Sequence, residues 1–424
     1  MKFSILLLNL VLLSGLSHGA VLTASAEATP AEQRITLARA AIKKNPQHYQ
    51  THAQLAMALA QRARETADTS YYTQAEAAIA QSLKLSPRNL EARKVQIWVM
   101  LGQHEFAESL KAAQALNKEV PDDVQVYGFL ADAQVELGNY AEAERAAQWM
   151  LDLRPGNIPG LTRAAHLREL FGDISGSLDL MEQAYQRTPP SEREDRAWLL
   201  THMAHLQLLD NQLTYADALL KQALQQFPDY HYALAQLAKV RQAQGRPAEA
   251  ITLLRQHVEV APHPENFFYL GEVLAQNGHA TEASAVFGKF AGAALAESAS
   301  WDNANRELIA YYADYAQRPA DALKLAETEI ARRQDVLTLD AYAWALYRNG
   351  HFEKARQAID RALTVGVRDP KLHYHAGMIA LKQGAHARAR DHLESALRFA
   401  PWADFATSAR AALQQAALGI PSPA

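Results

Sequence analysis

Prolines recur along this chain at a constant interval, and no other feature constrains its fold as strongly. Pro87, Pro121, Pro155 and Pro189 are evenly spaced, and the same interval returns, after one longer step, between Pro228 and Pro262. A period of about 34 residues is typical of repeat arrays, in which each unit buries its apolar face against its neighbours. At 424 residues the chain is also too long for one ordinary core, so we expect several domains or one elongated array.

Composition points to helices and argues against two classes of partner. Hydrophobic residues make up 49% of the chain, and Ala and Leu dominate among them, which favours helix over strand. The net charge is only −4, and the sequence holds no long cluster of Lys and Arg. We therefore expect no nucleic-acid partner and no attraction to anionic lipid through bulk charge.

The segment 1–26 has the pattern of an export signal of bacterial type. Lys2 precedes an apolar stretch from Ile5 to Leu16 that is short for a membrane span. Ala24-Ser25-Ala26 fits a cleavage site, with retention of the segment as an anchor as the alternative. The chain has no cysteine, which excludes disulfides and lipid attachment through an N-terminal cysteine. We predict an exported protein, periplasmic or secreted, without stable membrane insertion after removal of this segment.

Several stretches repeat one set of marker residues in register. The clearest are Gly138-Asn139-Tyr140-Ala141-Glu142-Ala143, Gly278-His279-Ala280-Thr281-Glu282-Ala283 and Gly384-Ala385-His386-Ala387-Arg388-Ala389. With a preceding large residue, a Leu-Ala or Leu-Gly step and a closing Pro, they resemble the tetratricopeptide repeat. The resemblance implies an all-α fold, a right-handed α-solenoid of about ten helix-turn-helix repeats. It also implies protein or peptide partners, and no cofactor.

Each marker residue has a physical reason at its position. A helix must end and reverse at six glycines, where glycine tolerates the left-handed conformation: Gly138, Gly172, Gly245, Gly278, Gly350 and Gly384. Gly102 fits the same template, whereas Ala63, Asn211 and Gln317 replace the glycine in other units. Small residues such as Ala143 and Ala355, five positions after the glycine, permit a close approach of two helices. Pro begins the next turn because it cannot continue a helix.

The repeat register divides the chain into segments. We predict a signal peptide over 1–26, an N-terminal helix within 27–44, a first part of the array over 45–295 and a second part over 296–401. A capping helix and a disordered tail complete the chain over 402–424. The division near 295 rests on the stretch from Ala291 to Ser300, which lacks the closing Pro. Residues from Arg64 to Tyr72 are expected to lengthen the first turn.

We find no set of residues with the spacing of a catalytic centre. His104 and Glu105 begin like a zinc-protease motif, but Glu108 stands where the second histidine is needed. His202 and His205 share a helix face and could hold a metal with a third ligand, but the sequence assigns none. We interpret them as one buried and one groove-facing side chain. His373 and His375 are two positions apart and should point to different faces. We predict no enzyme, no catalytic or cofactor-binding residues and no metal.

In an array of this family, the first helix of each pair lines the concave wall. The resemblance places on that wall Phe268, Tyr311, Tyr315, Trp344, Tyr347, Arg348, Tyr374 and Met378. Aromatic and Met side chains are the usual anchors for a bound peptide or helix. Several of the rings could instead pack between neighbouring helices. Basic residues could form a rim that receives carboxylates: Arg241, Arg348, Lys371 and Lys382.

The favoured interpretation is a non-catalytic interaction scaffold of the periplasm or cell envelope, which binds a partner segment on its concave surface. Two alternatives remain open. One is a metal-dependent protein or enzyme that uses the histidines. The other is a self-assembling structural protein, since the sequence leaves the oligomeric state undecided.

Overall fold

The computed structural model describes residues 28–300 and 303–418. Over these residues the chain forms helices and no strand. The N-terminal helix α1 (Pro30–Lys44) begins with a capping box between Thr29 and Glu32, and α22 (Ala406–Leu418) comes last. The predicted signal peptide over 1–26 and the predicted tail after 418 lie outside the described residues.

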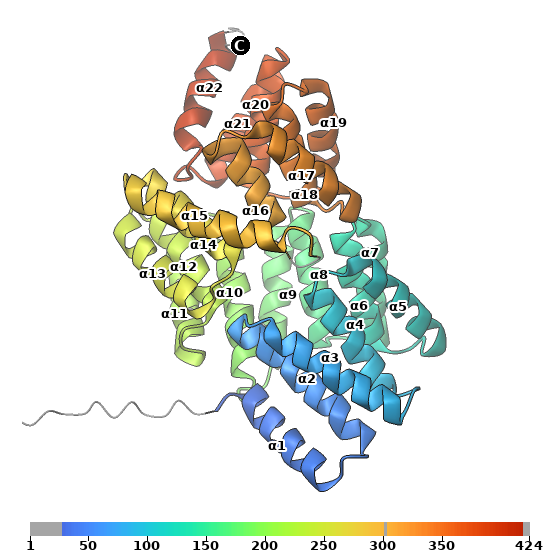
Figure 1. Cartoon of the computed structure of the whole chain (residues 1–424). Helices are drawn as coiled ribbons and strands as arrows, with labels where there is room; N and C mark the ends of the chain where they lie inside the picture. The colour runs from blue at the N-terminus through green and yellow to red at the C-terminus, as the bar shows by residue number, and fades with distance from the viewer. Residues whose placement is uncertain (1–27, 301–302, 419–424) are drawn as a thin grey trace, which may run out of the picture.

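Within this part of the chain, ten helix pairs stand between the two end helices (Figure 1). The first helices of the pairs are α2 (Tyr49–Thr66), α4 (Leu90–Gly102), α6 (Val124–Glu136), α8 (Ile158–Leu170), α10 (Arg193–Leu209), α12 (His231–Ala243), α14 (Pro264–Gln276), α16 (Asn305–Ala310) with the π-helical turn η1 (Tyr311–Tyr315), α18 (Val336–Arg348) and α20 (Pro370–Lys382). The second helices are α3 (Ser70–Leu85), α5 (Phe106–Glu119), α7 (Tyr140–Leu153), α9 (Ile174–Arg187), α11 (Leu213–Gln226), α13 (Pro247–Val260), α15 (Ala280–Glu297), α17 (Pro319–Arg332), α19 (Phe352–Leu363) and α21 (His386–Phe399). We number the pairs as units one to ten. The predicted α-solenoid of about ten repeats is confirmed.

The six glycines predicted at the turns all adopt the left-handed conformation, with φ between 70° and 79°. Asn211 and Gln317, which replace glycine in units five and eight, adopt it as well, with φ of 58° and 54°. The reversal of the chain therefore requires this conformation even where the residue is not glycine.

Two turns differ from the prediction. In unit one, Ala63 lies inside α2 and is buried, and the left-handed residue is Ala67, so the turn comes later than expected. In unit two, the left-handed residue is His104 rather than Gly102. Gly102 serves another purpose, because a Cβ at this position would lie 2.5 Å from the ring of Tyr72. That glycine is thus explained by helix packing and not by backbone conformation.

Small residues bring the helices together as predicted. Ala143 and Ala355 have no exposed surface. At Gly271, a Cβ would lie 2.6 Å from the ring of Phe287, so a larger residue cannot fit without a shift. Buried apolar side chains also continue from α12 to α18, across the division predicted near residue 295.

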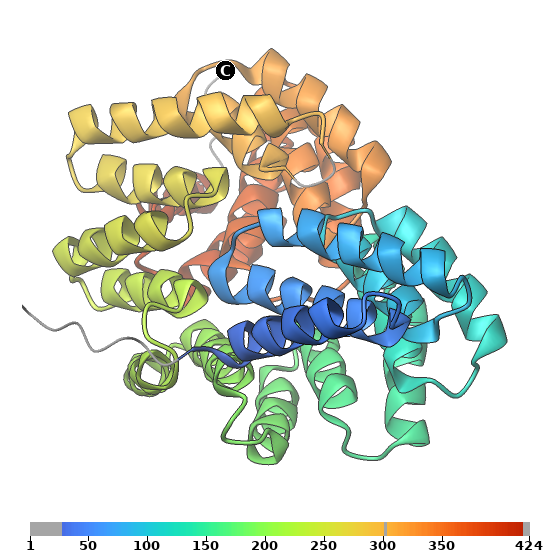
Figure 2. The same ribbon diagram turned by 60° about the horizontal axis from the view of Figure 1, so that its bottom comes forward.

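The array winds so far that its later units contact its earlier ones (Figures 1 and 2). The turn of unit three meets the link between units eight and nine, where the backbone N–H of Val336 donates to the hydroxyl oxygen of Tyr140 at 2.9 Å. The turn of unit five meets the end of unit ten, where the Asn211 side chain donates to the carbonyl of Arg398 at 3.0 Å. Each turn thus contacts the chain about five units later. We call this set of contacts the seam.

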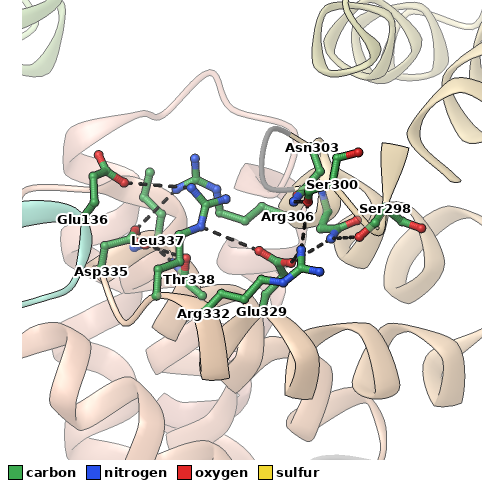
Figure 3. A network of polar contacts seen from close by, with 12 residues as sticks. Glu136, Ser298, Ser300, Asn303, Arg306, Glu329, Arg332, Asp335, Leu337 and Thr338 are labelled. Carbon is green, nitrogen blue, oxygen red and sulfur yellow. Dashed lines mark hydrogen bonds and ion pairs between the residues drawn. The ribbon is translucent and has the colours of Figure 1, made fainter. Parts of the chain in front are cut away.

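The seam holds buried charges, and they are paired (Figure 3). Glu329 is 1% exposed and accepts hydrogen bonds from Asn305 at 2.7 Å and Arg332 at 3.0 Å. Arg333 is also buried, and it lies 3.7 Å from Glu329 and 3.9 Å from Glu136 of unit three. Breaking such a pair leaves a buried charge without compensation, which is strongly destabilising. The seam is therefore part of the folded structure.

The first unit also contacts units in the middle of the array. Arg64 near the end of α2 forms ion pairs with Glu194 and Asp195 of α10. The Tyr230 hydroxyl donates to Glu194 at 2.5 Å, and the backbone carbonyl of Arg64 accepts from Nε2 of His231 at 3.1 Å. Figure 2 shows α1 to α3 lying across the loop of later helices. Both ends of the array are thus anchored against its middle.

Candidate functional site

A hollow of about 600 Å³ opens where the last units meet the capping helix. Its walls come from α14, η1, α18, α20 and the start of α22. The lining side chains include Glu272, Asp314, Tyr315, Trp344, Tyr347, Arg348, Lys371, Tyr374, His375, Met378, Asp404 and Phe405. First helices of consecutive pairs supply most of them, as expected for the concave wall.

Stacked rings form one wall of the hollow. Trp344 and Tyr347 lie three positions apart on one face of α18, and their ring centroids are 4.7 Å apart at 13°. His375 of α20 stacks on Trp344 at 4.1 Å and is held in place by Asp340, whose carboxylate lies 2.8 Å from its Nδ1. The indole N–H of Trp344 donates to the carboxylate of Asp314 at 3.0 Å. The rings are therefore fixed in orientation before any partner arrives.

The adjoining part of the lining comes from α20 and the link to the capping helix. Tyr374 stacks on Phe405 with centroids 4.8 Å apart at 12°, and Met378 lies one turn further along α20. Burial, together with nearby carboxylates such as Asp314, raises the pKa of Tyr374 to about 12. Its hydroxyl thus stays protonated and can donate a hydrogen bond throughout the physiological range.

The hollow carries more acidic than basic groups. Lys371 lies 3.5 Å from Glu272, and Arg348 lies 2.9 Å from Asp314. Burial raises the pKa of Glu272 to about 7, although Lys371 opposes this shift. The carboxylate of Glu272 raises the pKa of Lys371 well above its usual value. Asp404 is exposed, and the backbone N–H of Phe405 donates to its carboxylate at 2.8 Å.

These pairings correct the predicted basic rim. Arg348 and Lys371 face carboxylates within the hollow, and Arg241 is buried against Asp217 in α11. Three of the four predicted rim cations are therefore neutralised inside the chain. Their charge is not available to receive the carboxylates of a partner.

Of the eight side chains predicted on the concave wall, six line the hollow: Tyr315, Trp344, Tyr347, Arg348, Tyr374 and Met378. Phe268 and Tyr311 do not. Phe268 is 5% exposed and packs against Phe290 at 5.1 Å, while Tyr311 packs against Phe287 at 5.4 Å. Both rings are covered by side chains of α15, Phe287 and Phe290.

Three residues of the hollow could not be placed from the repeat register. Asp404 and Phe405 precede the capping helix, which belongs to no repeat and so has no register from which to predict. Asp314 lies in η1, where the wider π-helical turn departs from the repeat pattern.

A second group of polar side chains lies on the concave wall between units four and five. Glu169 of α8 is 9% exposed, and its carboxylate oxygens lie 2.8 Å from Nε2 of His202 and 2.9 Å from Nε2 of His205, both on α10. Nδ1 of His166, one turn before Glu169, lies 3.6 Å from the same carboxylate. Burial would raise the pKa of Glu169, but its hydrogen bonds with the three histidines outweigh burial and lower the pKa far below its usual range.

This arrangement corrects the interpretation of His202 and His205 as one buried and one groove-facing side chain, because both face Glu169. The signal that could have revealed it is a pair of i,i+3 motifs, His166 with Glu169 and His202 with His205, on consecutive first helices. His373 and His375 do point apart as predicted: His373 contacts His392, whereas His375 contacts Asp340.

Comparison with known families agrees with the geometry of the helix pairs. One family model described as tetratricopeptide repeat matches residues 96–158 and 341–404, and a second with the same description matches residues 207–270. The chain is a tetratricopeptide repeat protein. The matched regions cover five of the ten units wholly or in large part, at the beginning, middle and end of the array. None of the curated proteins matches the chain.

Solved structures with the same fold share little sequence with this tetratricopeptide repeat protein. Human IFIT1, solved as a dimer with m7Gppp-AAAA, is 15% identical over 86% of this chain and 85% of its own, with a TM-score of 0.50. TTC0263 of Thermus thermophilus is 20% identical over 45% of this chain and 98% of its own, with a TM-score of 0.40. The Cut9–Hcn1 tetramer is 12% identical with a TM-score of 0.45, and the match spans 90% of this chain but 58% of that one.

The likeness to human IFIT1 shows the fold alone. Within residues 28–300 and 303–418, no helix is long and apolar enough for a membrane crossing.

Proposed function

We propose that this tetratricopeptide repeat protein is a non-catalytic interaction scaffold that binds a segment of a partner protein in the hollow between unit seven and the capping helix. Proteins of this repeat family typically bind protein or peptide partners. The observation that carries the proposal is a pair of partly exposed rings, Tyr347 and Tyr374, held in place by the buried Trp344 beside an exposed carboxylate. Pre-ordered aromatic side chains provide contact area at little entropic cost.

The chemistry of the hollow favours a basic segment. Three carboxylates, from Glu272, Asp314 and Asp404, face two cations, from Lys371 and Arg348, so the hollow is negative when Glu272 is ionised. A Lys or Arg side chain of a partner would gain a cation–π contact with the partly exposed ring of Tyr347 or Tyr374 and an ion pair with Asp404. We therefore infer a partner segment with a Lys or Arg beside an apolar residue.

The proposal includes export of the chain to the periplasm or beyond the cell. It rests on the segment 1–26, with Lys2, the apolar stretch and Ala24-Ser25-Ala26. Mass spectrometry of the mature N-terminus from fractionated cells tests it. A cleaved chain outside the cytoplasm supports export, whereas an intact Met1 in the cytoplasmic fraction contradicts it.

Binding itself is tested with fluorescent synthetic peptides and anisotropy on the full chain. One peptide series carries Lys or Arg beside Leu, and a matched series carries Glu in the same place. We expect saturable binding of the basic series only. Replacing Tyr374 by Ala or Asp404 by Lys should weaken it at least about tenfold, as for an interface anchor.

Matched controls lie on second helices, away from the hollow. Tyr215 is 64% exposed on α11 and Asp391 is exposed on α21. Tyr215→Ala and Asp391→Lys should leave the affinity unchanged. Equal binding of the basic and acidic series, or equal losses in the control variants, would show that the hollow is not the binding site.

A further inference from the structure

The histidine cluster between units four and five has the composition of a metal site. The potential ligand atoms of His166, Glu169 and His202 all lie within 4.8 Å of one another, and His205 contacts the other oxygen of the same carboxylate at 2.9 Å. Three imidazoles therefore surround one buried carboxylate. A single imidazole would be enough to satisfy a structural carboxylate, and the hollow described above uses none of these four residues.

We propose that His166, Glu169 and His202 bind one divalent transition-metal ion, with Zn²⁺ as the cation of best fit, while His205 holds the other oxygen of the Glu169 carboxylate. Two nitrogen donors and one carboxylate oxygen make a three-ligand set of the kind found in zinc sites whose fourth position is open to water. Without sulfur ligands the set does not select soft cations, and with a single carboxylate it is poor for Mg²⁺ or Ca²⁺.

The geometry of the helices supports this assignment. Helix α8 supplies His166 and Glu169 at i,i+3 and α10 supplies His202, so the three ligands project from the facing sides of the two helices. One oxygen of the Glu169 carboxylate lies 2.8 Å from Nε2 of His202 and 3.6 Å from Nδ1 of His166, close to the separation of about 3.3 Å between neighbouring ligand atoms in a tetrahedral zinc site with bonds near 2.0 Å. Only small movements of the side chains are needed to receive an ion.

An ion can also reach the cluster from solvent. The side chains of His166 and His205 are 44% and 28% exposed. His166 further lines a hollow of about 250 Å³ together with Asp132 and Glu136, through which an ion can approach the cluster. On its inner side, the ring of Trp198 stacks on His202 at 5.4 Å and holds that ligand in place. The ion would join unit four to unit five.

The experiment uses the full chain without an affinity tag, stripped of metal by a chelator. Calorimetric titration with Zn²⁺ should show one ion bound per chain, and the same titration with Mg²⁺ should show none. Zn²⁺ should raise the melting temperature, because it binds the folded chain in preference to the unfolded one. Co²⁺ in place of Zn²⁺ should give the visible absorption of a four-coordinate site.

Two ligand variants and one control complete the design. His202→Ala and Glu169→Gln should each weaken Zn²⁺ binding at least about 100-fold and abolish the rise in melting temperature. The Gln variant keeps the size of the side chain, so it separates loss of a ligand from misfolding, which circular dichroism monitors. His279→Ala, at an exposed position before α15, should bind Zn²⁺ like the original chain. Failure of the original chain to bind Zn²⁺ more tightly than His202→Ala would overturn the proposal.

Discussion

Gly138 lies so close to Gln334 that a Cβ on residue 138 would stand 2.5 Å from the backbone carbonyl oxygen of residue 334. Two positions further on, Tyr140 and Val336 share a hydrogen bond. This pair of contacts joins unit three to the link between units eight and nine. Glycine is therefore needed at position 138 for two reasons: the turn has the left-handed conformation, and a distant backbone approaches closely.

The first prediction compares Gly138 with Gly245, where glycine is needed only for the left-handed conformation. Gly245 has φ of +70°, and no described atom lies within 4 Å of the Cβ it lacks. Gly245→Ala should cost only the left-handed conformation, about 1 kcal/mol. Gly138→Ala should cost that amount plus roughly 1–3 kcal/mol for the clash at the seam. Thermal and denaturant unfolding measure the difference, and equal losses would mean that the seam does not form in solution.

The second prediction concerns the close helix contacts. Ala143 and Ala355 are completely buried, so replacing either by Leu should overfill the contact and cost about 1–3 kcal/mol. Ala248, exposed on α13, provides the control, since Leu there meets solvent. Melting temperatures of the three variants give the comparison. A normal melting temperature for both buried variants would contradict the packing.

The third prediction concerns pH and two buried histidines. His231 and His257 are stacked 6.4 Å apart, and burial lowers the pKa of each to about 4. For His257, the neighbouring His231, His263 and Lys239 add to the shift. Between pH 6.5 and 4 the unfolded chain therefore binds protons that the folded chain does not. Stability must fall as the pH falls through this window.

As the pH falls from 6.5 to 5, proton uptake by the unfolded chain at each of these histidines should lower the free energy of unfolding by about 2 kcal/mol. In His257→Leu the free energy of unfolding should depend less steeply on pH, because leucine takes up no proton. His279→Leu, at an exposed position, should behave like the original chain. Unfolding curves at several pH values give the comparison, and an unchanged slope in His257→Leu would exclude this explanation.

The fourth prediction rests on the proposed function. Glu272 has a pKa of about 7 and lines the hollow, so the hollow becomes more negative as the pH rises from 6 to 8. The affinity for a basic peptide should rise a few-fold over that range. In Glu272→Gln the affinity should stay constant with pH, while Glu249→Gln, on the exposed start of α13, should keep the original profile. Anisotropy titrations at each pH provide the measurement, and a pH profile that survives in Glu272→Gln would assign the effect to another group.

Much of the fold could be predicted because each repeat depends on contacts that are local in sequence. The left-handed turns at the glycines and the close helix contact at Ala143 recur with the repeat, so the repeat period was enough to place them. The exceptions are Ala67 and His104, which adopt the left-handed conformation in place of Ala63 and Gly102; at Gly102 the ring of Tyr72 explains the glycine instead.

The seam and the two sites were harder to predict for a physical reason. Small rotations between neighbouring units add up along the array, and their sum decides that Tyr140 meets Val336, 196 residues later. Exposure on the concave wall depends on which side chains the adjacent second helix carries, as Phe290 of α15 against Phe268 illustrates. Glu169 was missed because its partners lie in the next unit, and only the two i,i+3 motifs on consecutive first helices indicate them.

At the seam, later units of the array contact earlier ones, so the array cannot lengthen along its axis without breaking those contacts. Repeat solenoids without such contacts can stretch by small rotations at every joint. Here any extension along the axis must first separate Glu136 from Arg333 and Asn211 from the carbonyl of Arg398. Pulled from its two ends, the molecule should resist with a distinct force peak before the individual hairpins begin to unravel.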